Sequence, residues 1–185
     1  MLFRSPSAML LLACVESGRE ADARAILEEM GDDIFREFRD FTFSRTEFIL
    51  ALVCAALDDS TRAEILYEIL LPSCALNAVS AFGYSLGSVS RYLGLLATTL
   101  GRFEDAERHF TEALAMNERT GARPYLAHTQ HEYAAMLLAR GHPDDRERAL
   151  DLVNRALGTA QELGMPPLAE RALALKIKAQ GIVSA

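Results

Sequence analysis

Apolar and small residues recur along this chain at helical spacing, and the pattern itself repeats every 43 residues. Two series of aligned positions show this offset: Ala63, Ala106, Ala149 and Leu71, Leu114, Leu157. Positions of a preceding helix and turn recur at the same offset, so each unit is predicted to be a helical hairpin. A period of this length is typical of solenoids, in which each unit buries its apolar face against its neighbours.

Residues at the expected helix ends agree with this period. Gly121 and Gly164 follow long helical runs, where glycine readily adopts the left-handed conformation that ends a helix. Pro124 and Pro167 come three residues later, at expected helix starts. No segment shows sustained alternation of apolar and polar residues, so we predict no strands.

We therefore predict an all-α fold, an α-solenoid that forms a single domain over residues 1–185. It is expected to contain about four hairpins and a C-terminal capping helix. The expected hairpins cover residues 5–30, 44–71, 87–119 and 125–163, and the capping helix covers residues 167–179.

Composition fits a packed helical protein. Half of the residues are hydrophobic and 24% are charged, which argues against disorder. The net charge of −7 makes direct nucleic-acid binding improbable. The three cysteines have no CxxC spacing, and Cys14 and Cys54 occupy equivalent apolar positions. We therefore expect buried reduced thiols, not disulfides or zinc ligands.

The N-terminal region predicts a cytoplasmic protein. Residues 11–14 superficially resemble a lipoprotein cleavage site, but their apolar run is short and matches the next repeat as a helix. No stretch approaches the roughly 20 apolar residues of a membrane span, so no membrane contact is expected. The apolar start Met1, Leu2 and Phe3 predicts self-association through the first repeat.

The residues that could take part in binding or catalysis give little indication of a functional site. The glycines Gly83, Gly87 and Gly94 lack the lysine and the preceding strand of a phosphate-binding loop, and close helix packing is the better interpretation. His109 and His142 are expected to be exposed.

His128, His131 and Glu132 lie on neighbouring faces of one expected helix. Three ligands without a cysteine favour an ordinary polar face over a metal site. No nucleophile elbow links a serine to a histidine and an aspartate. We predict no enzyme activity, no metal and no cofactor.

The positions that repeat also match a known signature. They are LeuGly at 93–94, Ala97, GlyArgPhe at 101–103, Ala106, Phe110 and Ala113. In this respect the chain resembles tetratricopeptide-repeat (TPR) proteins, and the resemblance implies a right-handed superhelix. The stretch RYLGLLATTLGRFEDAERHFTEALAMNERTGARPYLAHTQHEYAAMLLARG is similar to the C-terminal repeat region of large bacterial signalling ATPases, which carry an adenylate cyclase or a LuxR-type DNA-binding domain.

In TPR arrays the first helix of each unit lines a concave groove. Projecting that register here gives a set of expected groove residues: Arg45, Phe48, Leu52, Ser88, Arg91, Leu95, Thr98, His128, His131 and Ala135. The arginines and histidines among them predict a locally basic groove that suits a carboxylate-bearing peptide or another anionic ligand. The alternative is that Arg45 and Arg91 pair with acidic residues of adjacent helices.

The resemblance implies a non-catalytic scaffold for protein interaction, in signal transduction or transcription regulation. Its partner is expected to be a peptide segment or a domain, including other domains of a parent ATPase. The alternative is a small-molecule inducer sensor of a LuxR-type activator. A sensor requires a closed pocket lined by aromatic residues, for which the candidates are Phe48, Tyr84, Tyr92 and Tyr125.

Overall fold

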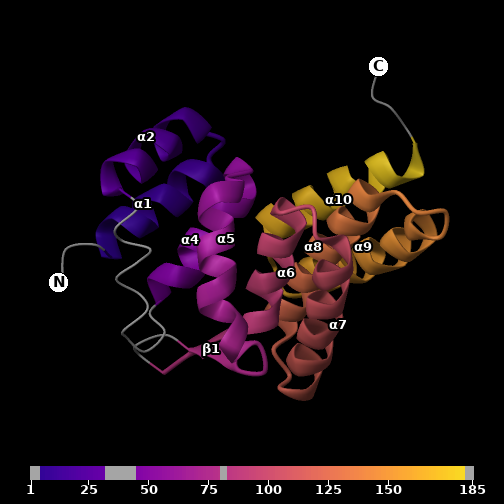
Figure 1. Cartoon of the computed structure of the whole chain (residues 1–185). Helices are drawn as coiled ribbons and strands as arrows, with labels where there is room; N and C mark the ends of the chain where they lie inside the picture. Colours follow the sequence, from indigo (N-terminus) through magenta and orange to yellow (C-terminus); the bar gives the residue numbers. More distant parts are fainter. Residues whose placement is uncertain (1–4, 32–44, 80–82, 182–185) are drawn as a thin grey trace.

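The computed structural model describes residues 5–31, 45–79 and 83–181, and these residues form mainly α-helices (Figure 1). In chain order the helices are α1 (Ser5–Glu16), α2 (Glu20–Met30), α4 (Arg45–Leu57), α5 (Ser60–Leu70), α6 (Val89–Thr99), α7 (Phe103–Arg119), α8 (Arg123–Arg140), α9 (Asp145–Glu162) and α10 (Pro166–Gln180). The prediction of a helical fold is confirmed. The expected contact surface at Met1, Leu2 and Phe3 lies outside the described residues.

Consecutive helices pack in pairs that follow one another across Figure 1. The pairs are α1 with α2, α4 with α5, α6 with α7 and α8 with α9, and α10 packs against α9 and α8. The first helices of successive pairs also contact each other, α1 with α4, α4 with α6 and α6 with α8. One side of the molecule is therefore built from the first helix of each pair.

Local signals in the sequence explain where these helices begin and end. The Asp59 carboxylate caps α5 by accepting a hydrogen bond from the Arg62 backbone N–H at 3.1 Å. Prolines lie in the first turn of α8 and of α10, where a backbone N–H has no helical acceptor. Gly141 ends α8 in the left-handed conformation, with φ 72°.

A short antiparallel pair of strands, β1 (Asn77–Val79) and β2 (Ser85–Ser88), lies between α5 and α6. The expectation of no strands is wrong here. Strands of three and four residues are too short to show the alternation from which strands are recognised. Tertiary contacts hold β2, since Tyr92 donates a hydrogen bond to the Leu86 carbonyl at 2.9 Å and the Ser88 backbone N–H donates to the Asn117 side-chain oxygen at 3.1 Å.

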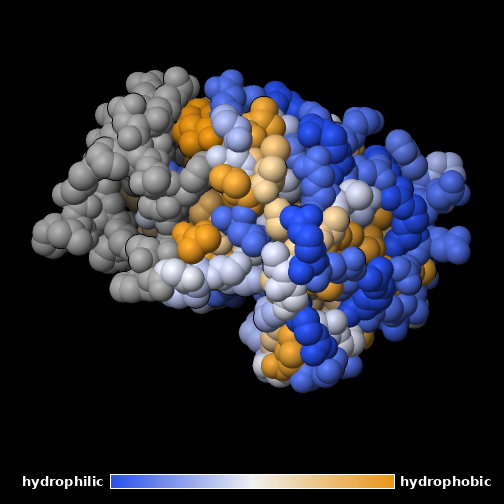
Figure 2. All heavy atoms as spheres, turned by 90° about the horizontal axis from the view of Figure 1, so that it is seen from below, coloured by the Kyte–Doolittle hydropathy of each residue, from blue (hydrophilic) through white to orange (hydrophobic). Residues whose placement is uncertain are grey.

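The segment between α5 and α6 carries apolar side chains on its surface. They are Leu71, Leu76, Val79 and Tyr84, each between 38% and 53% exposed. The segment lies at the lower edge of Figure 1, and the view from below in Figure 2 shows hydrophobic residues beside the grey atoms, whereas hydrophilic residues dominate the other half of this face.

The largest hydrophobic cluster is continuous from α1 to α10, and two glycines permit close contacts in or beside it. A β-carbon on Gly94 of α6 would lie 2.9 Å from the Phe110 ring, and one on Gly87 would lie 2.8 Å from Tyr125. Close helix packing is therefore confirmed for Gly94, whereas Gly87 lies in strand β2 and packs closely against α8. Gly83 has open space around it.

The cysteines are free, as expected. Cys14 and Cys54 are buried and Cys74 is partly buried. Burial raises the pKa of the Cys54 thiol to about 12, which keeps this thiol protonated and unreactive at neutral pH. Among the described helices, none is long and apolar enough to cross a membrane.

We predict opposite effects of two glycine-to-alanine changes. Gly94→Ala should destabilise the protein by about 1–2 kcal/mol, because its methyl group meets the buried Phe110 ring. Gly158→Ala in α9 should stabilise it by up to about 1 kcal/mol. The added β-carbon would have no neighbouring atom within 4 Å, and alanine favours the helical conformation more than glycine does. Chemical denaturation of both variants measures the difference, and equal effects would show that the contact with Phe110 is unimportant.

Candidate ligand-binding cavity

The first helices of the pairs surround a cavity of about 470 Å³. Helices α1, α4, α6 and α8 form its walls and α10 contributes one residue. The lining residues are Leu12, Val15, Glu16, Leu52, Ala55, Ala56, Arg91, Leu95, Thr98, Thr99, His128, His131, Glu132, Ala135, Met136 and Arg171. Residues from the beginning and the end of the chain therefore meet at one site.

Helical spacing brings these side chains to the same side. On α6, Arg91, Leu95 and Thr98 are separated by four and three residues, so they form a stripe along one face. The cavity-lining residues of α8 have the same spacing. His128 is followed three and four residues later by His131 and Glu132, and four residues after these come Ala135 and Met136.

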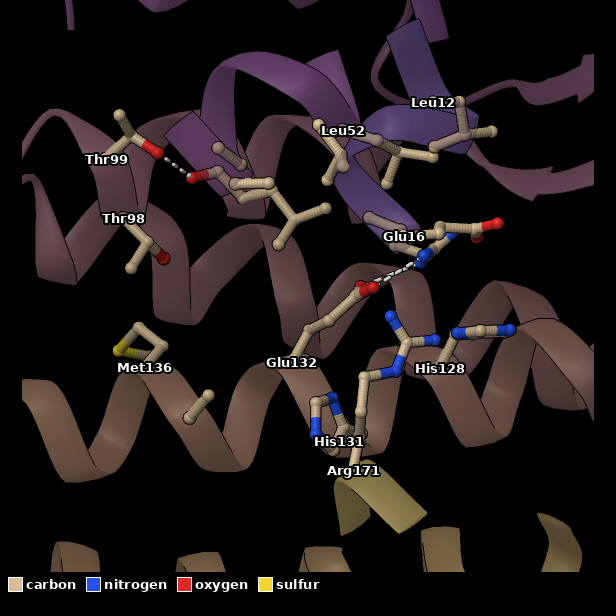
Figure 3. Close-up of a pocket in the computed structure, with 16 residues that line it drawn as sticks. Leu12, Glu16, Leu52, Thr98, Thr99, His128, His131, Glu132, Met136 and Arg171 are labelled. Atoms are coloured by element: carbon tan, nitrogen blue, oxygen red, sulfur yellow. Dashed lines mark hydrogen bonds and ion pairs between the residues drawn. The ribbon is translucent and has the colours of Figure 1, made fainter. Parts of the chain in front are cut away.

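The cavity has an apolar part and a polar part (Figure 3). Aliphatic side chains from α1 and α4, such as Leu12 and Leu52, lie opposite α8. His128, His131 and Arg171 gather at one end of the view, away from Met136. The cavity is therefore suited to a ligand that has both an apolar and a polar portion.

A buried ion pair connects α6 and α8 across this site. Arg91 donates from Nε to one Glu132 oxygen at 2.7 Å and from Nη2 to the other at 2.5 Å. The side chains are only 5% and 14% exposed. This two-point geometry fixes the relative position of both groups, and the negative charge of Glu132 balances the positive charge of Arg91.

The expected basic groove therefore needs a correction. Arg91 is neutralised by Glu132 of an adjacent helix, which is the alternative that the sequence left open. The side chain of Arg45 lies outside the described residues.

Both histidines of the cavity are uncharged at neutral pH. Burial, and next the positive charge of Arg91, lower the pKa of His128 to about 4. Burial also lowers the pKa of His131, although Glu132 opposes this shift. No group of histidine, cysteine and acidic side chains able to hold a metal ion occurs in the described part of the chain.

Two exposed charged residues lie at the mouth of the cavity. Glu16 is at the end of α1 and Arg171 is in the second turn of α10. Both also line a neighbouring hollow between these two helices. Neither has an ion-pair partner among the described residues, so both side chains are available to a ligand.

Two of the expected groove residues lie elsewhere. Phe48 is buried in the core and packs against Tyr92, with the ring centroids 4.8 Å apart. Ser88 is buried as the N-cap of α6, where its hydroxyl accepts a hydrogen bond from the Ser90 N–H. Leu52, Arg91, Leu95, Thr98, His128, His131 and Ala135 do line the cavity.

The aromatic candidates for a sensor pocket do not surround the cavity either. Phe48 and Tyr92 are buried, Tyr84 is exposed, and Tyr125 packs against Gly87. The described lining contains no phenylalanine or tyrosine.

Sequence reasoning missed the contributions of α1 and α10. A signal existed in the repeats, because Leu12 precedes Leu52 by 40 residues, the offset between the first two units. Arg171 follows His128 by 43 residues, so α10 aligns with the first helix of a hairpin.

His109 is the other correction. It was expected to be exposed, but it is fully buried between α5 and α7. Its Nε2 lies 3.0 Å from the Tyr67 hydroxyl, whereas its Nδ1 has no hydrogen-bond partner in the described part of the structure. Burial lowers the pKa of His109. His142 is exposed, as expected.

No family model matches this sequence, and comparison with the curated proteins and with the solved structures found no match. The function is therefore inferred from the cavity and from the residues that line it.

Removing one partner of the ion pair should destabilise the fold. Arg91→Met should lower the free energy of unfolding by roughly 2–3 kcal/mol, because it leaves the Glu132 carboxylate buried without a partner. The double variant Arg91→Met/Glu132→Leu should recover most of the loss. Urea denaturation tests both, and a double variant no more stable than Arg91→Met would contradict the expected recovery.

Acid should weaken the protein through His128. A histidine whose folded-state pKa is depressed contributes stability above its unfolded value near 6.5, and this is lost as the pH falls toward 4. We expect His128→Gln to reduce the loss of unfolding free energy between pH 6.5 and 4.5 by on the order of 2 kcal/mol. The matched control His142→Gln, at an exposed position, should leave the pH dependence unchanged. Parallel curves for wild type and His128→Gln would contradict this.

Proposed function

We propose that the chain is a TPR-like, right-handed α-solenoid that serves as a non-catalytic binding module. In this proposal it belongs to a bacterial signalling or transcription-regulatory ATPase and works in the cytoplasm. Its ligand is a peptide segment of a partner or of another domain of the same protein. The observation that carries the proposal is the shared cavity, which is bounded by the first helix of every pair and by α10.

The cavity has the size and lining of a binding site. Its volume of about 470 Å³ falls within the range of ligand pockets in proteins. The aliphatic side chains of α1, α4 and α6 offer an apolar wall for side chains such as leucine or valine. Burial of one such side chain contributes roughly 1.5–3 kcal/mol, so two or three give a specific complex.

Several contacts support a role without catalysis. Thr98 and Thr99 are the hydroxyl side chains of the cavity, and both donate to carbonyls of their own helix, Gly94 at 2.7 Å and Leu95 at 3.2 Å. Neither hydroxyl is bonded to a base, which an activated nucleophile requires. The cavity lining therefore favours holding a ligand over converting it.

A small-molecule ligand is the second candidate, and the volume of the cavity favours it. The same 470 Å³ suits a compact metabolite that has an apolar body and one polar group. The lack of aromatic residues in the described lining makes this candidate weaker than a peptide with aliphatic side chains.

Filling the cavity tests the proposal. Ala135 lines the cavity, whereas Ala139 is exposed one turn later on the same helix. Peptides are selected from a displayed random library on the wild-type protein, and their affinities are measured by fluorescence polarisation. Ala135→Trp should weaken binding more than tenfold because the indole occupies the space of the ligand, and Ala139→Trp should leave it unchanged.

Three other outcomes have distinct meanings. Peptides whose affinity is the same for wild type and Ala135→Trp would place binding outside the cavity. If no peptide is enriched but a metabolite mixture raises the melting temperature of the wild type and not of Ala135→Trp, the small-molecule candidate is favoured. If neither class of ligand binds, the proposal fails.

A further inference from the structure

The charges around the polar end of the cavity balance each other. Arg91 and Glu132 form a closed pair inside. Arg171 and Glu16 bring one positive and one negative charge to the mouth. His128 and His131 line the same cavity as these four charged groups, which belong to α6, α8, α10 and α1, and Figure 3 shows both imidazoles at the same end as Arg171.

This balance restricts what an ion can do on entering. A carboxylate inside the cavity adds a negative charge for which the buried pair holds no counter-charge, because the charge of Arg91 is already balanced by the Glu132 carboxylate that its Nε and Nη2 bind. Burying an uncompensated charge is costly. The exposed Arg171 offers a partial counter-charge, and an imidazole that accepts a proton offers a full one.

We propose that the cavity binds a carboxylate together with a proton. The carboxylate lies between Arg171 and the imidazoles of His128 and His131, and the proton is taken from solvent by one of these imidazoles. The ligand class is a peptide segment with aliphatic side chains beside an aspartate or glutamate. The inference rests on the proposed peptide-binding function and adds to it that binding strengthens in mild acid.

The effects of burial and of nearby charges on the two histidine pKa values support this coupling between binding and proton uptake. Burial and the charges of Arg91 and Arg171 hold the pKa of His128 well below its usual value, whereas Glu132 acts in the opposite direction. The pKa of His131 is lowered by burial and by the charge of Arg171, and Glu132 opposes this shift. An anion at the same end adds a second negative charge, which favours the protonated form of either ring. The added proton restores electrical balance in the occupied cavity.

Matched peptides test the inference. The probes are acetyl-Leu-Leu-Asp-amide and acetyl-Leu-Leu-Asn-amide, which differ in charge and hardly in shape. Their binding to the full chain is followed between pH 5 and 7.5 by NMR, through the signals of the methyl groups and histidine rings in the cavity. The aspartate stays ionised throughout this range.

We expect the affinity for the Asp probe to rise as the pH falls below about 6.5, approaching tenfold per pH unit if one proton is taken up. The affinity for the Asn probe should not change with pH. Calorimetry at pH 5.5 in buffers of different ionisation enthalpy should give uptake of about one proton for the Asp probe and none for the Asn probe.

Variants separate this mechanism from a general effect of pH. The double variant His128→Gln/His131→Gln should flatten the pH dependence for the Asp probe, whereas the control His142→Gln should behave like the wild type. Equal affinities for both probes, or a pH dependence that survives in the double variant, would overturn the inference and leave the peptide-binding proposal standing. No binding of either probe would count against both.

Discussion

The character of the cavity depends on one interaction, the buried ion pair between Arg91 and Glu132. It joins α6 to α8, the first helices of adjacent pairs, and removes the net charge that either residue would bring. Although burial opposes it, Glu132 raises the pKa of Arg91 above its usual value, so the guanidinium stays charged. Its charge in turn helps to keep His128 neutral. The surface between the helices is therefore polar but electrically balanced.

A second polar network holds α7, α8 and α9 together away from the cavity lining. Arg140 binds Asp145 and Glu107, and Arg148 reaches the other Glu107 oxygen at 2.5 Å. Although burial opposes it, these hydrogen bonds lower the pKa of Glu107 to about 2. Hydrogen bonds from Arg140 likewise lower the pKa of Asp145 to about 2. In the folded protein both carboxylates therefore stay ionised across the pH range in which the cavity histidines titrate.

The close packing of the framework matters for a binding site made from separate helices. Close contacts at Gly94 and Gly87 set how nearly α6 and its preceding strand approach their neighbours. Because each wall of the cavity belongs to a different helix, a small shift between pairs changes the shape of the whole site. The affinity for a ligand that contacts several walls therefore depends on how all the helix pairs are arranged, which is a property useful in a regulatory module.

The sequence by itself determined the helical hairpins, their approximate ends and the buried cysteines, because these depend on spacing and on residues such as Gly141 and Pro167 that act locally. It also placed Arg91, Leu95 and His128 on one side, since residues three and four apart share a helix face. Only the tertiary structure decided that Arg91 meets Glu132, that Arg171 lines the cavity together with residues of α1, and that His109 is buried against Tyr67. These partners lie between 41 and more than 150 residues apart in the sequence. Their meeting depends on how successive pairs are stacked and curved, and no local pattern encodes that geometry.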